Sequence, residues 1–152
     1  MTRSPKDIYQ DWLDRIADAV WAGNHDLVAA AVVYPHKLIT RDGQAEIASP
    51  EQMMGASEEF RSALVSMGAD GYHRICKSAE IDETGDRIDG THMTFVMRSG
   101  TYAIAPFSNR MTLVRRDGAW CATEISADVS NANCAVFSPT HMKRFASGGG
   151  QS

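Results

Sequence analysis

The hydrophobic pattern of this chain changes its period once, near Tyr72, and this change constrains the fold more than any other feature. Before Tyr72, apolar side chains recur every three to four residues, which is typical of amphipathic helices. After Tyr72 they alternate along the chain, as in strands with one buried face. The sequence therefore predicts an α+β domain in which helices come first and a sheet follows.

Start and stop signals delimit two helices at the N-terminus. Ser4–Asp7 combines a capping serine, a proline at the first helical position and an acidic first turn, and Gly23 is a stop signal. The first helix is therefore expected to run to about Ala22. A short second helix follows Asn24, with its apolar residues between Leu27 and Val32.

A hairpin and a third helix complete the first part of the chain. The hairpin joins His36–Thr40 to Gln44–Ile47 around Asp42-Gly43, a dipeptide that tolerates positive φ. Ser49–Gln52 then has the form of a capping box, and Gly68 is the expected stop of the helix that it opens.

Three turn dipeptides, each ending in glycine at positions 85, 100 and 118, divide the next part into four strands of an antiparallel meander. Strands this long have to curl in a small domain, and Gly90 and Pro106 are the expected places for a bulge or a bend. The four strands are expected at about Tyr72–Glu83, Asp86–Arg98, Thr101–Arg116 and Ala119–Ala127.

Length and composition exclude several classes of protein. The 152 residues suit one domain, which we assign to residues 1–130, and residues 131–152 form a C-terminal extension with a disordered end rich in glycine and serine. The longest apolar run, Leu27–Tyr34, is too short to cross a membrane, and the N-terminus lacks the apolar region of a secretion signal. We therefore expect a cytoplasmic protein.

Charge and cysteine usage exclude further functions. A net charge of −4 without a dense run of Lys and Arg argues against nucleic acid as a partner. The three cysteines are widely spaced and form no CxxC pair, which favours free thiols over disulfides or a metal site. We expect no metal and no cofactor.

The order of the elements resembles the nuclear transport factor 2-like, or SnoaL-like, superfamily with its cystatin-like fold. The resemblance spans about Ile8 to Ser130 and includes Gly23 with the short helix after it, Ser49-Pro50-Glu51 opening the third helix, and Arg115–Trp120, a DG turn followed by tryptophan. It implies a curved antiparallel sheet wrapped around the N-terminal helices and a cone-shaped pocket between them. It also implies that the outer face of the sheet pairs with a second subunit.

The superfamily includes steroid isomerases, polyketide cyclases, dehydratases and epoxide hydrolases, and also members without catalytic activity. Steroid isomerases carry a catalytic Asp and Tyr at positions where this chain has Thr40 and Ile16, with Asp42 and Tyr9 nearby. This difference argues against steroid isomerase activity.

The turns predict which strand residues face one another. Two-residue loops would place His92 opposite Phe107 and Asn109 opposite Ser126, and would bring His92, Asn109 and Glu124 together on one apolar face. His92 would then be a general base, Glu124 would orient its ring, and Asn109 would donate to an oxyanion. The alternative is a hydrogen-bonded set that only satisfies its own buried polar atoms.

These residues lead to two functional hypotheses. In the first, the pocket binds a small, largely apolar metabolite and catalyses proton transfer, such as isomerisation, cyclisation or dehydration. Its ligand-binding residues would be Trp12, Phe60, Phe107 and Tyr9. In the second, the chain is a non-catalytic dimeric binding or scaffold domain whose pocket is filled by its own side chains. An open cavity lined by His92 and Glu124 would favour the first.

The other face of the predicted sheet is also apolar and carries Met93, Phe95, Met97 and Tyr102. An apolar outer face favours a homodimer. Arg74 and Arg110 are assigned to this face too, where they would bind an anionic ligand or form ion pairs across the subunit boundary.

Overall fold

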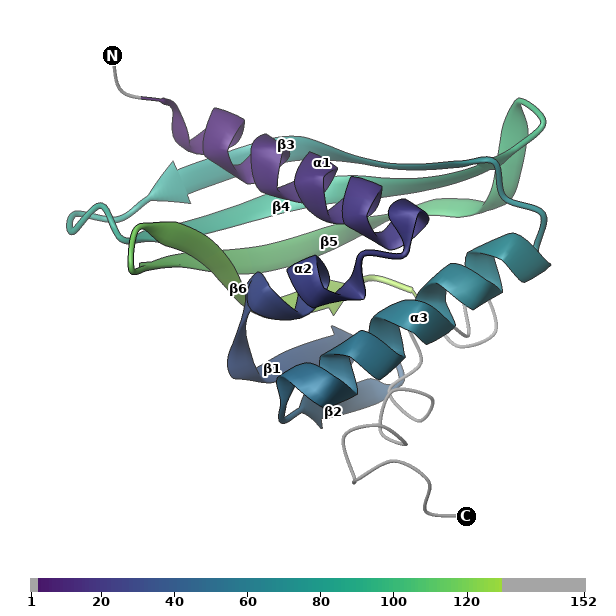
Figure 1. Ribbon diagram of the computed structural model, residues 1–152. Coiled ribbons are helices and arrows are strands. Elements are labelled where there is room, and N and C mark those ends of the chain that lie inside the picture. The colour runs from purple at the N-terminus through teal and green to yellow at the C-terminus, as the bar shows by residue number, and fades with distance from the viewer. Residues whose placement is uncertain (1–2, 130–152) are drawn as a thin grey trace.

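Three helices lie against one face of a curved six-stranded sheet, and residues 3–129 are described by this computed structural model (Figure 1). The helices are α1 (Pro5–Ala22), α2 (His25–Ala30) and α3 (Pro50–Ser66). The strands are β1 (Val32–Thr40), β2 (Gly43–Ile47), β3 (Gly71–Ile81), β4 (Arg87–Arg98), β5 (Thr101–Arg116) and β6 (Ala119–Ala127). Their order in the sheet is β2-β1-β6-β5-β4-β3. The predicted α+β class is confirmed, and the extension predicted for residues 131–152 lies outside the described residues.

The helix boundaries follow from the capping residues. The Ser4 hydroxyl accepts a hydrogen bond from the Asp7 N–H at 3.1 Å, and Gly23 ends α1 with a φ of 76°. The Ser49 hydroxyl accepts from the Gln52 N–H at 3.3 Å and opens α3 in the same way. Both helices therefore begin where the sequence predicted.

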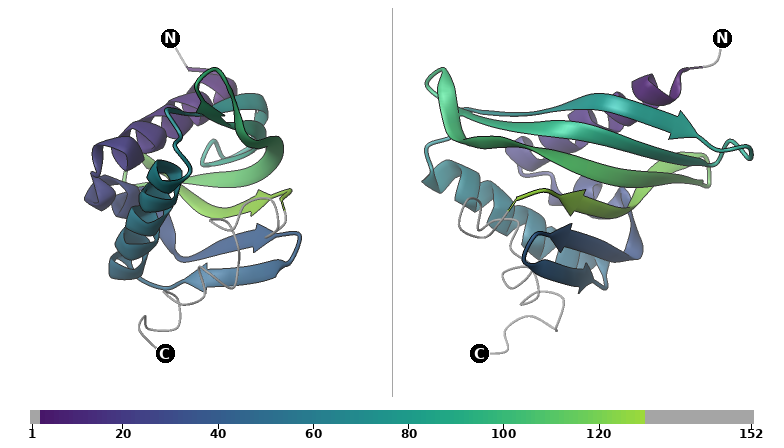
Figure 2. Two further views of the ribbon diagram at one scale, coloured as in Figure 1. Left: turned by 90° about the vertical axis from the view of Figure 1, so that its right-hand side faces the viewer. Right: turned by 180° about the vertical axis from the view of Figure 1, so that it is seen from behind.

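Strand β1 differs from the predicted hairpin arm in length and in partner. The second helix ends at Ala30, and the β-branched Val32 and Val33 begin a strand instead of continuing the helix. Besides pairing antiparallel with β2, β1 pairs parallel with β6, with Leu38 opposite Ile125. The sheet is therefore mixed, with one parallel pair that joins the N-terminal hairpin to the meander. Figure 2 shows how this sheet curves around the helices.

The register between β4 and β5 differs from the prediction by two residues at its centre. His92 pairs with Asn109 and Thr94 pairs with Phe107, because the register shifts twice between Thr94 and Met97. Each shift adds one residue to β5, and Pro106 lies at one of them, as predicted. A shift of two residues keeps every side chain on its face but changes its neighbours.

A further register shift, between β5 and β6, overturns the predicted position of Glu124. Leu113 pairs with Ala122, but Thr112 pairs with Glu124, so β6 contains one extra residue at Thr123. Ile125 faces the helices as a result, and Glu124 lies on the outer face of the sheet. Glu124 therefore does not share a face with His92.

Gly90 has a role other than the predicted bend. It pairs regularly with Met111 in β5, and the ring of Tyr9 in α1 lies directly against it. A Cβ atom at residue 90 would lie 2.5 Å from Tyr9 Cε2 and 2.7 Å from the carbonyl oxygen of Ser78. The glycine therefore allows α1 to approach the sheet closely.

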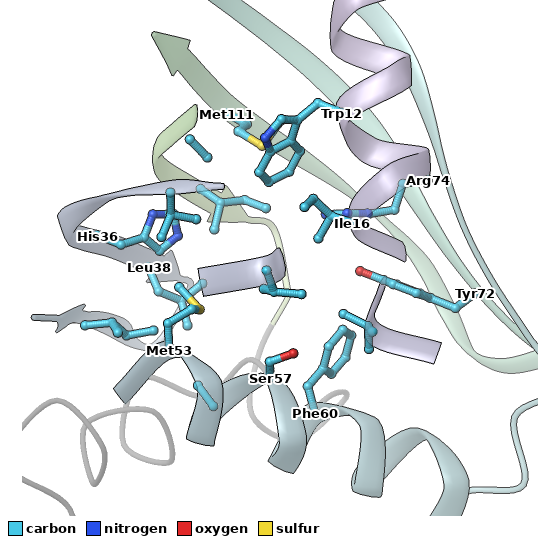
Figure 3. A pocket seen from close by; sticks show the side chains of 17 residues that line it. Trp12, Ile16, His36, Leu38, Met53, Ser57, Phe60, Tyr72, Arg74 and Met111 are labelled. Carbon is cyan, nitrogen blue, oxygen red and sulfur yellow. The ribbon is translucent and has the colours of Figure 1, made fainter. Parts of the chain in front are cut away.

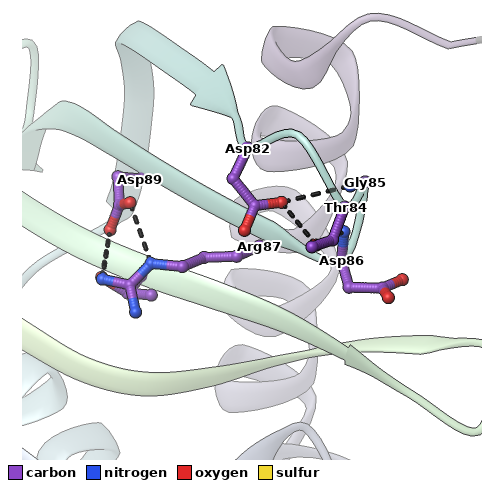
Figure 4. Close-up of polar contacts among 7 residues, drawn as sticks. Asp82, Thr84, Gly85, Asp86, Arg87 and Asp89 are labelled. Carbon is purple, nitrogen blue, oxygen red and sulfur yellow. Dashed lines mark hydrogen bonds and ion pairs between the residues drawn. The ribbon is translucent and has the colours of Figure 1, made fainter.

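The outer face of the sheet is divided into two parts. Near the β4–β5 turn it is apolar, with Ile75 47% and Tyr102 56% exposed. Towards the β3–β4 turn it is polar, and Arg87 donates to both carboxylate oxygens of Asp89 at 3.0 and 3.1 Å (Figure 4). The predicted apolar character therefore holds for one part of this face.

The side chain of Asp82 stabilises the β3–β4 turn. The side chain of Asp82 accepts hydrogen bonds from the Thr84 hydroxyl at 2.7 Å and from the Gly85 N–H at 3.1 Å (Figure 4). These bonds lower the pKa of Asp82, with the Thr84 hydroxyl as the largest cause.

Across residues 3–129, the helices are too short or too polar to cross a membrane.

Candidate functional site

A cavity of about 130 Å³ lies between the helices and the inner face of the sheet (Figure 3). Helix α1 contributes Trp12 and Ile16 to its wall, α3 contributes Phe60, and the central strands β5 and β6 contribute Met111 and Ile125. These side chains face inward because each lies on the apolar face of its own element. The wall is therefore mainly apolar.

The volume limits what the cavity can hold. An engineered apolar cavity of about 150 Å³ binds benzene, whereas pockets for drug-sized molecules measure about 300 to 1,000 Å³. In the described conformation, the space therefore suits a molecule close in size to one aromatic ring.

Arg74 brings a positive charge into this apolar space. Arg74 is 7% exposed, although β3 is an edge strand of the sheet. Its Nη2 donates to the backbone oxygen of Leu13 at 3.2 Å, and its guanidinium carbon lies 5.8 Å from the ring centre of Trp12 and 5.4 Å from that of Tyr72. Nε has no hydrogen-bond partner among residues 3–129. The sequence had placed Arg74 on the outer face, but it pairs with the buried Thr94 and faces the helices.

His36 reaches the cavity from β1, on the side opposite Arg74 (Figure 3). Burial lowers the pKa of His36 to about 4, and hydrogen bonds to the backbone of Ala122 and Thr123 oppose this effect. A backbone bond that raises the pKa of a histidine is one in which the ring donates. Since Nδ1 has no partner within the described range 3–129, it is left as a neutral hydrogen-bond acceptor at neutral pH.

Unpartnered polar atoms are concentrated at this cavity. Within residues 3–129, four buried side-chain nitrogens lack a hydrogen-bond partner, and three belong to residues of the cavity wall. These three are Trp12 Nε1, His36 Nδ1 and Arg74 Nε. Buried polar atoms are normally paired, so three exceptions around one cavity indicate groups that a bound molecule would satisfy.

The predicted catalytic residues do not meet in the cavity. His92 is fully buried, and its Nδ1 lies 2.7 Å from the Tyr9 hydroxyl. Asn109 is buried beside it and accepts a hydrogen bond from the Thr94 hydroxyl at 2.6 Å. Neither lines the cavity, and Glu124 is on the opposite face. The predicted arrangement of His92, Asn109 and Glu124 is therefore wrong, because the bulge at Thr123 was not visible in the turn spacing.

Two of the four predicted ligand-binding residues lie in the cavity wall. Trp12 and Phe60 line it. Tyr9 is buried against Gly90, and Phe107 belongs to a separate apolar cluster with Ala127 and Val129. This difference follows from the register between β4 and β5, which pairs Phe107 with Thr94 and places it near the C-terminal end of α3.

Sequence reasoning missed His36 as a site residue and gave Arg74 the wrong face. Both could have been found from alternation within their own strands. His36 alternates with Leu38, and Arg74 lies between Tyr72 and Cys76, so anchoring each strand on its apolar residues would have turned both polar side chains inward. No group of three His, Cys, Asp or Glu residues suited to a metal ion occurs in the part of the chain that the structure describes.

Comparison with known proteins places this geometry in a known fold. No protein-family model and no curated protein matches the sequence. A nuclear transport factor 2-like protein from Novosphingobium aromaticivorans aligns with a TM-score of 0.62 at 17% identity, over 87% of this chain and 86% of its own. One of unknown function from Shewanella oneidensis has a TM-score of 0.64 at 11% identity, over 83% of this chain and 100% of its own.

This chain has the cystatin-like fold of nuclear transport factor 2-like proteins. The same fold occurs in Aln2 from Streptomyces, with a TM-score of 0.59 and 17% identity over 84% of this chain and 94% of that one. At these identities the likeness concerns the fold alone. The function has to be argued from the cavity itself.

Proposed function

We propose that this nuclear transport factor 2-like domain binds a small, largely apolar molecule in the cavity between its helices and its sheet. The observation that carries the proposal is the set of three unpartnered nitrogens, on Trp12, His36 and Arg74, around an otherwise apolar wall. A few polar groups in a mostly apolar concave site are typical of small-molecule binding.

The alternative function was a scaffold domain whose pocket is filled by its own side chains. Trp12 and Phe60, the large side chains that could fill it, line the cavity, and about 130 Å³ of it is left open. A filled pocket would also be expected to pair its own polar atoms. Binding is therefore the better supported function.

Native mass spectrometry of freshly purified protein tests this proposal. We expect a bound small molecule, or uptake of an added probe such as benzamide, in the unmodified chain. Ala56, which lies in the wall on α3 and is 2% exposed, offers a cavity-filling variant, Ala56→Leu, that should lose this binding. Ala48→Leu makes the same change at an exposed site and should retain it. Equal binding by both variants would place the ligand elsewhere.

Proton transfer on the bound molecule is the second candidate function. Its support is His36 Nδ1, a neutral acceptor without a partner in an apolar cavity, which makes His36 a candidate general base in place of His92. Isomerisation, cyclisation or dehydration would use such a base without a metal or nucleotide cofactor. Deuterium uptake from D2O into a co-purified ligand, abolished by His36→Gln, would support this function. If the uptake did not exceed that of the free ligand, proton transfer would be excluded and only the binding function would remain.

We also propose that the protein is a cytoplasmic homodimer joined through the apolar part of the outer sheet face. Exposed side chains such as Ile75 and Tyr102 support a partner there, and a second copy presents the same apolar surface. The free thiols of Cys76 and Cys121 support a reducing compartment. Cys134 lies outside the described residues.

A further inference from the structure

We infer that the molecule bound in the cavity is a small monocarboxylate whose carboxylate lies against Arg74 and whose apolar body fills the rest of the space. This inference rests on the proposed binding function and names the class of ligand for the same site.

Arg74 is a buried cation that lacks an anionic partner. It is more than nine-tenths buried, and none of the ion pairs found among residues 3–129 includes it. In the part of the chain that the structure describes, its side chain makes one hydrogen bond, from Nη2 to the Leu13 oxygen, and Nε has no partner. Because a buried charge is costly unless it is paired and hydrogen-bonded, this arrangement indicates an anion from outside the described chain.

A second hydrogen-bond donor without a partner among the described residues, on Trp12, lies in the same cavity wall. Trp12 Nε1 also lacks a partner, and the Trp12 ring lies beside the Arg74 guanidinium, 5.8 Å from ring centre to guanidinium carbon. Arginine and tryptophan can only donate hydrogen bonds. A group that only accepts and has two oxygen atoms, such as a carboxylate, suits the unused donors of a buried guanidinium. An amide or an alcohol brings donors of its own, and an ammonium group would be repelled.

The environment of the guanidinium strengthens its attraction for an anion. The rings of Trp12 and Tyr72 flank Arg74 and limit its contact with water. A carboxylate at Arg74 would therefore be held more strongly than at an exposed arginine.

The volume and the wall define the remainder of the ligand. Beyond Arg74 the wall is formed by side chains such as Ile16, Phe60 and Met111, which suit an apolar body of one ring or a short alkyl chain. Inorganic phosphate, which has no apolar body, should not bind. His36 Nδ1 on the opposite side would accept a hydrogen bond from a ligand hydroxyl.

Calorimetric titration with matched pairs of probes tests the ligand class. Benzoate and benzamide have nearly the same shape, as do hexanoate and hexanamide, and only the acids are anionic at neutral pH. We expect the better acid to bind at least about tenfold more tightly than its amide, as expected for hydrogen bonds to a charged group. Equal affinities within each pair would overturn the carboxylate assignment but retain the binding function. Absence of binding by all four probes would overturn both.

A pair of arginine variants separates a ligand-binding role of Arg74 from a structural one. Arg74→Met should weaken acid binding at least about tenfold and amide binding less than about threefold. It should also raise the melting temperature of the ligand-free protein, because it removes an unpaired buried charge. Arg110→Met changes an exposed arginine of the outer face and should alter neither. Unchanged acid affinity in Arg74→Met, or a melting temperature that falls, would contradict the assignment.

Discussion

The hydroxyl of Tyr9 lies 2.7 Å from Nδ1 of His92, which connects helix α1 to the middle of strand β4 inside the core. Burial raises the pKa of Tyr9 and lowers that of His92 to about 2, so both groups are neutral at physiological pH. The histidine that the sequence suggested as a catalytic base is therefore bonded to a helix, away from the cavity that Arg74 and His36 face.

Removal of the Tyr9 hydroxyl should destabilise the protein. Tyr9→Phe leaves a buried ring nitrogen of His92 without its partner, which we expect to lower the free energy of unfolding by about 1 to 3 kcal/mol. Urea denaturation measures this change. Tyr102→Phe removes an exposed hydroxyl and should have an effect within about 0.5 kcal/mol of zero. If the two variants were equally stable, the Tyr9–His92 bond would not matter to the fold.

Gly90→Ala should disturb the packing of α1 on the sheet. The new methyl group would clash with the Tyr9 ring and with the Ser78 backbone, and we expect a loss of about 1 to 3 kcal/mol in unfolding free energy. Because Tyr9 is one of the two clashing groups, the double variant Gly90→Ala/Tyr9→Leu should lose less than the sum of the single variants. If urea denaturation showed that the losses of the single variants simply add up in the double variant, the contact between Tyr9 and residue 90 would not matter to stability.

Stability should fall as the pH drops below about 6.5. The pKa values of His36 and His92 are lowered in the folded chain, to about 4 and about 2, so at these two residues only the unfolded chain takes up protons in this range. Between pH 7.5 and pH 5.5, protonation of each histidine in the unfolded chain should lower the free energy of unfolding by about 1.4 kcal/mol. Urea denaturation at both pH values measures this loss, and His36→Gln should remove about half of it. A stability that is equal at both pH values would show that neither histidine is kept neutral by burial.

The proposed dimer predicts that a charge on the apolar outer face separates the subunits. Ile75→Lys introduces a cation among apolar side chains at 47% exposure, where the monomer alone would tolerate it. Sedimentation equilibrium should give twice the chain mass for the unmodified protein and the chain mass for the variant. Val65→Lys, at an exposed position on α3, is the matched control and should remain dimeric. An unmodified protein that sediments as a monomer at micromolar concentration would exclude the dimer.

The elements of this fold could be predicted because their signals are local. Ser4, Gly23 and Ser49 set the helix boundaries, and glycine turns divide the meander. The parallel pairing of β1 with β6 could not be predicted, because these strands are distant in sequence and no turn connects them.

The site was less predictable because it depends on register. An extra residue at Thr123 turns Glu124 outward, and two register shifts between Thr94 and Met97 move Phe107 away from His92. The combined shift of two residues in β5 leaves little trace in the hydrophobic pattern, because it preserves the alternation. Arg74 was assigned to the wrong face because a buried, unpaired arginine is rare in a core.

The central claim, that the cavity binds a small molecule, is tested most directly by methyl NMR spectra recorded during titration with benzoate and, separately, benzamide. We predict that at least one probe shifts methyl signals of Ile16, Val28 and Leu38, which line the cavity, and leaves those of the exposed Val65 and Ile75 unchanged. Spectra unaffected by both probes at millimolar concentration, or shifts confined to Val65 and Ile75, would contradict it.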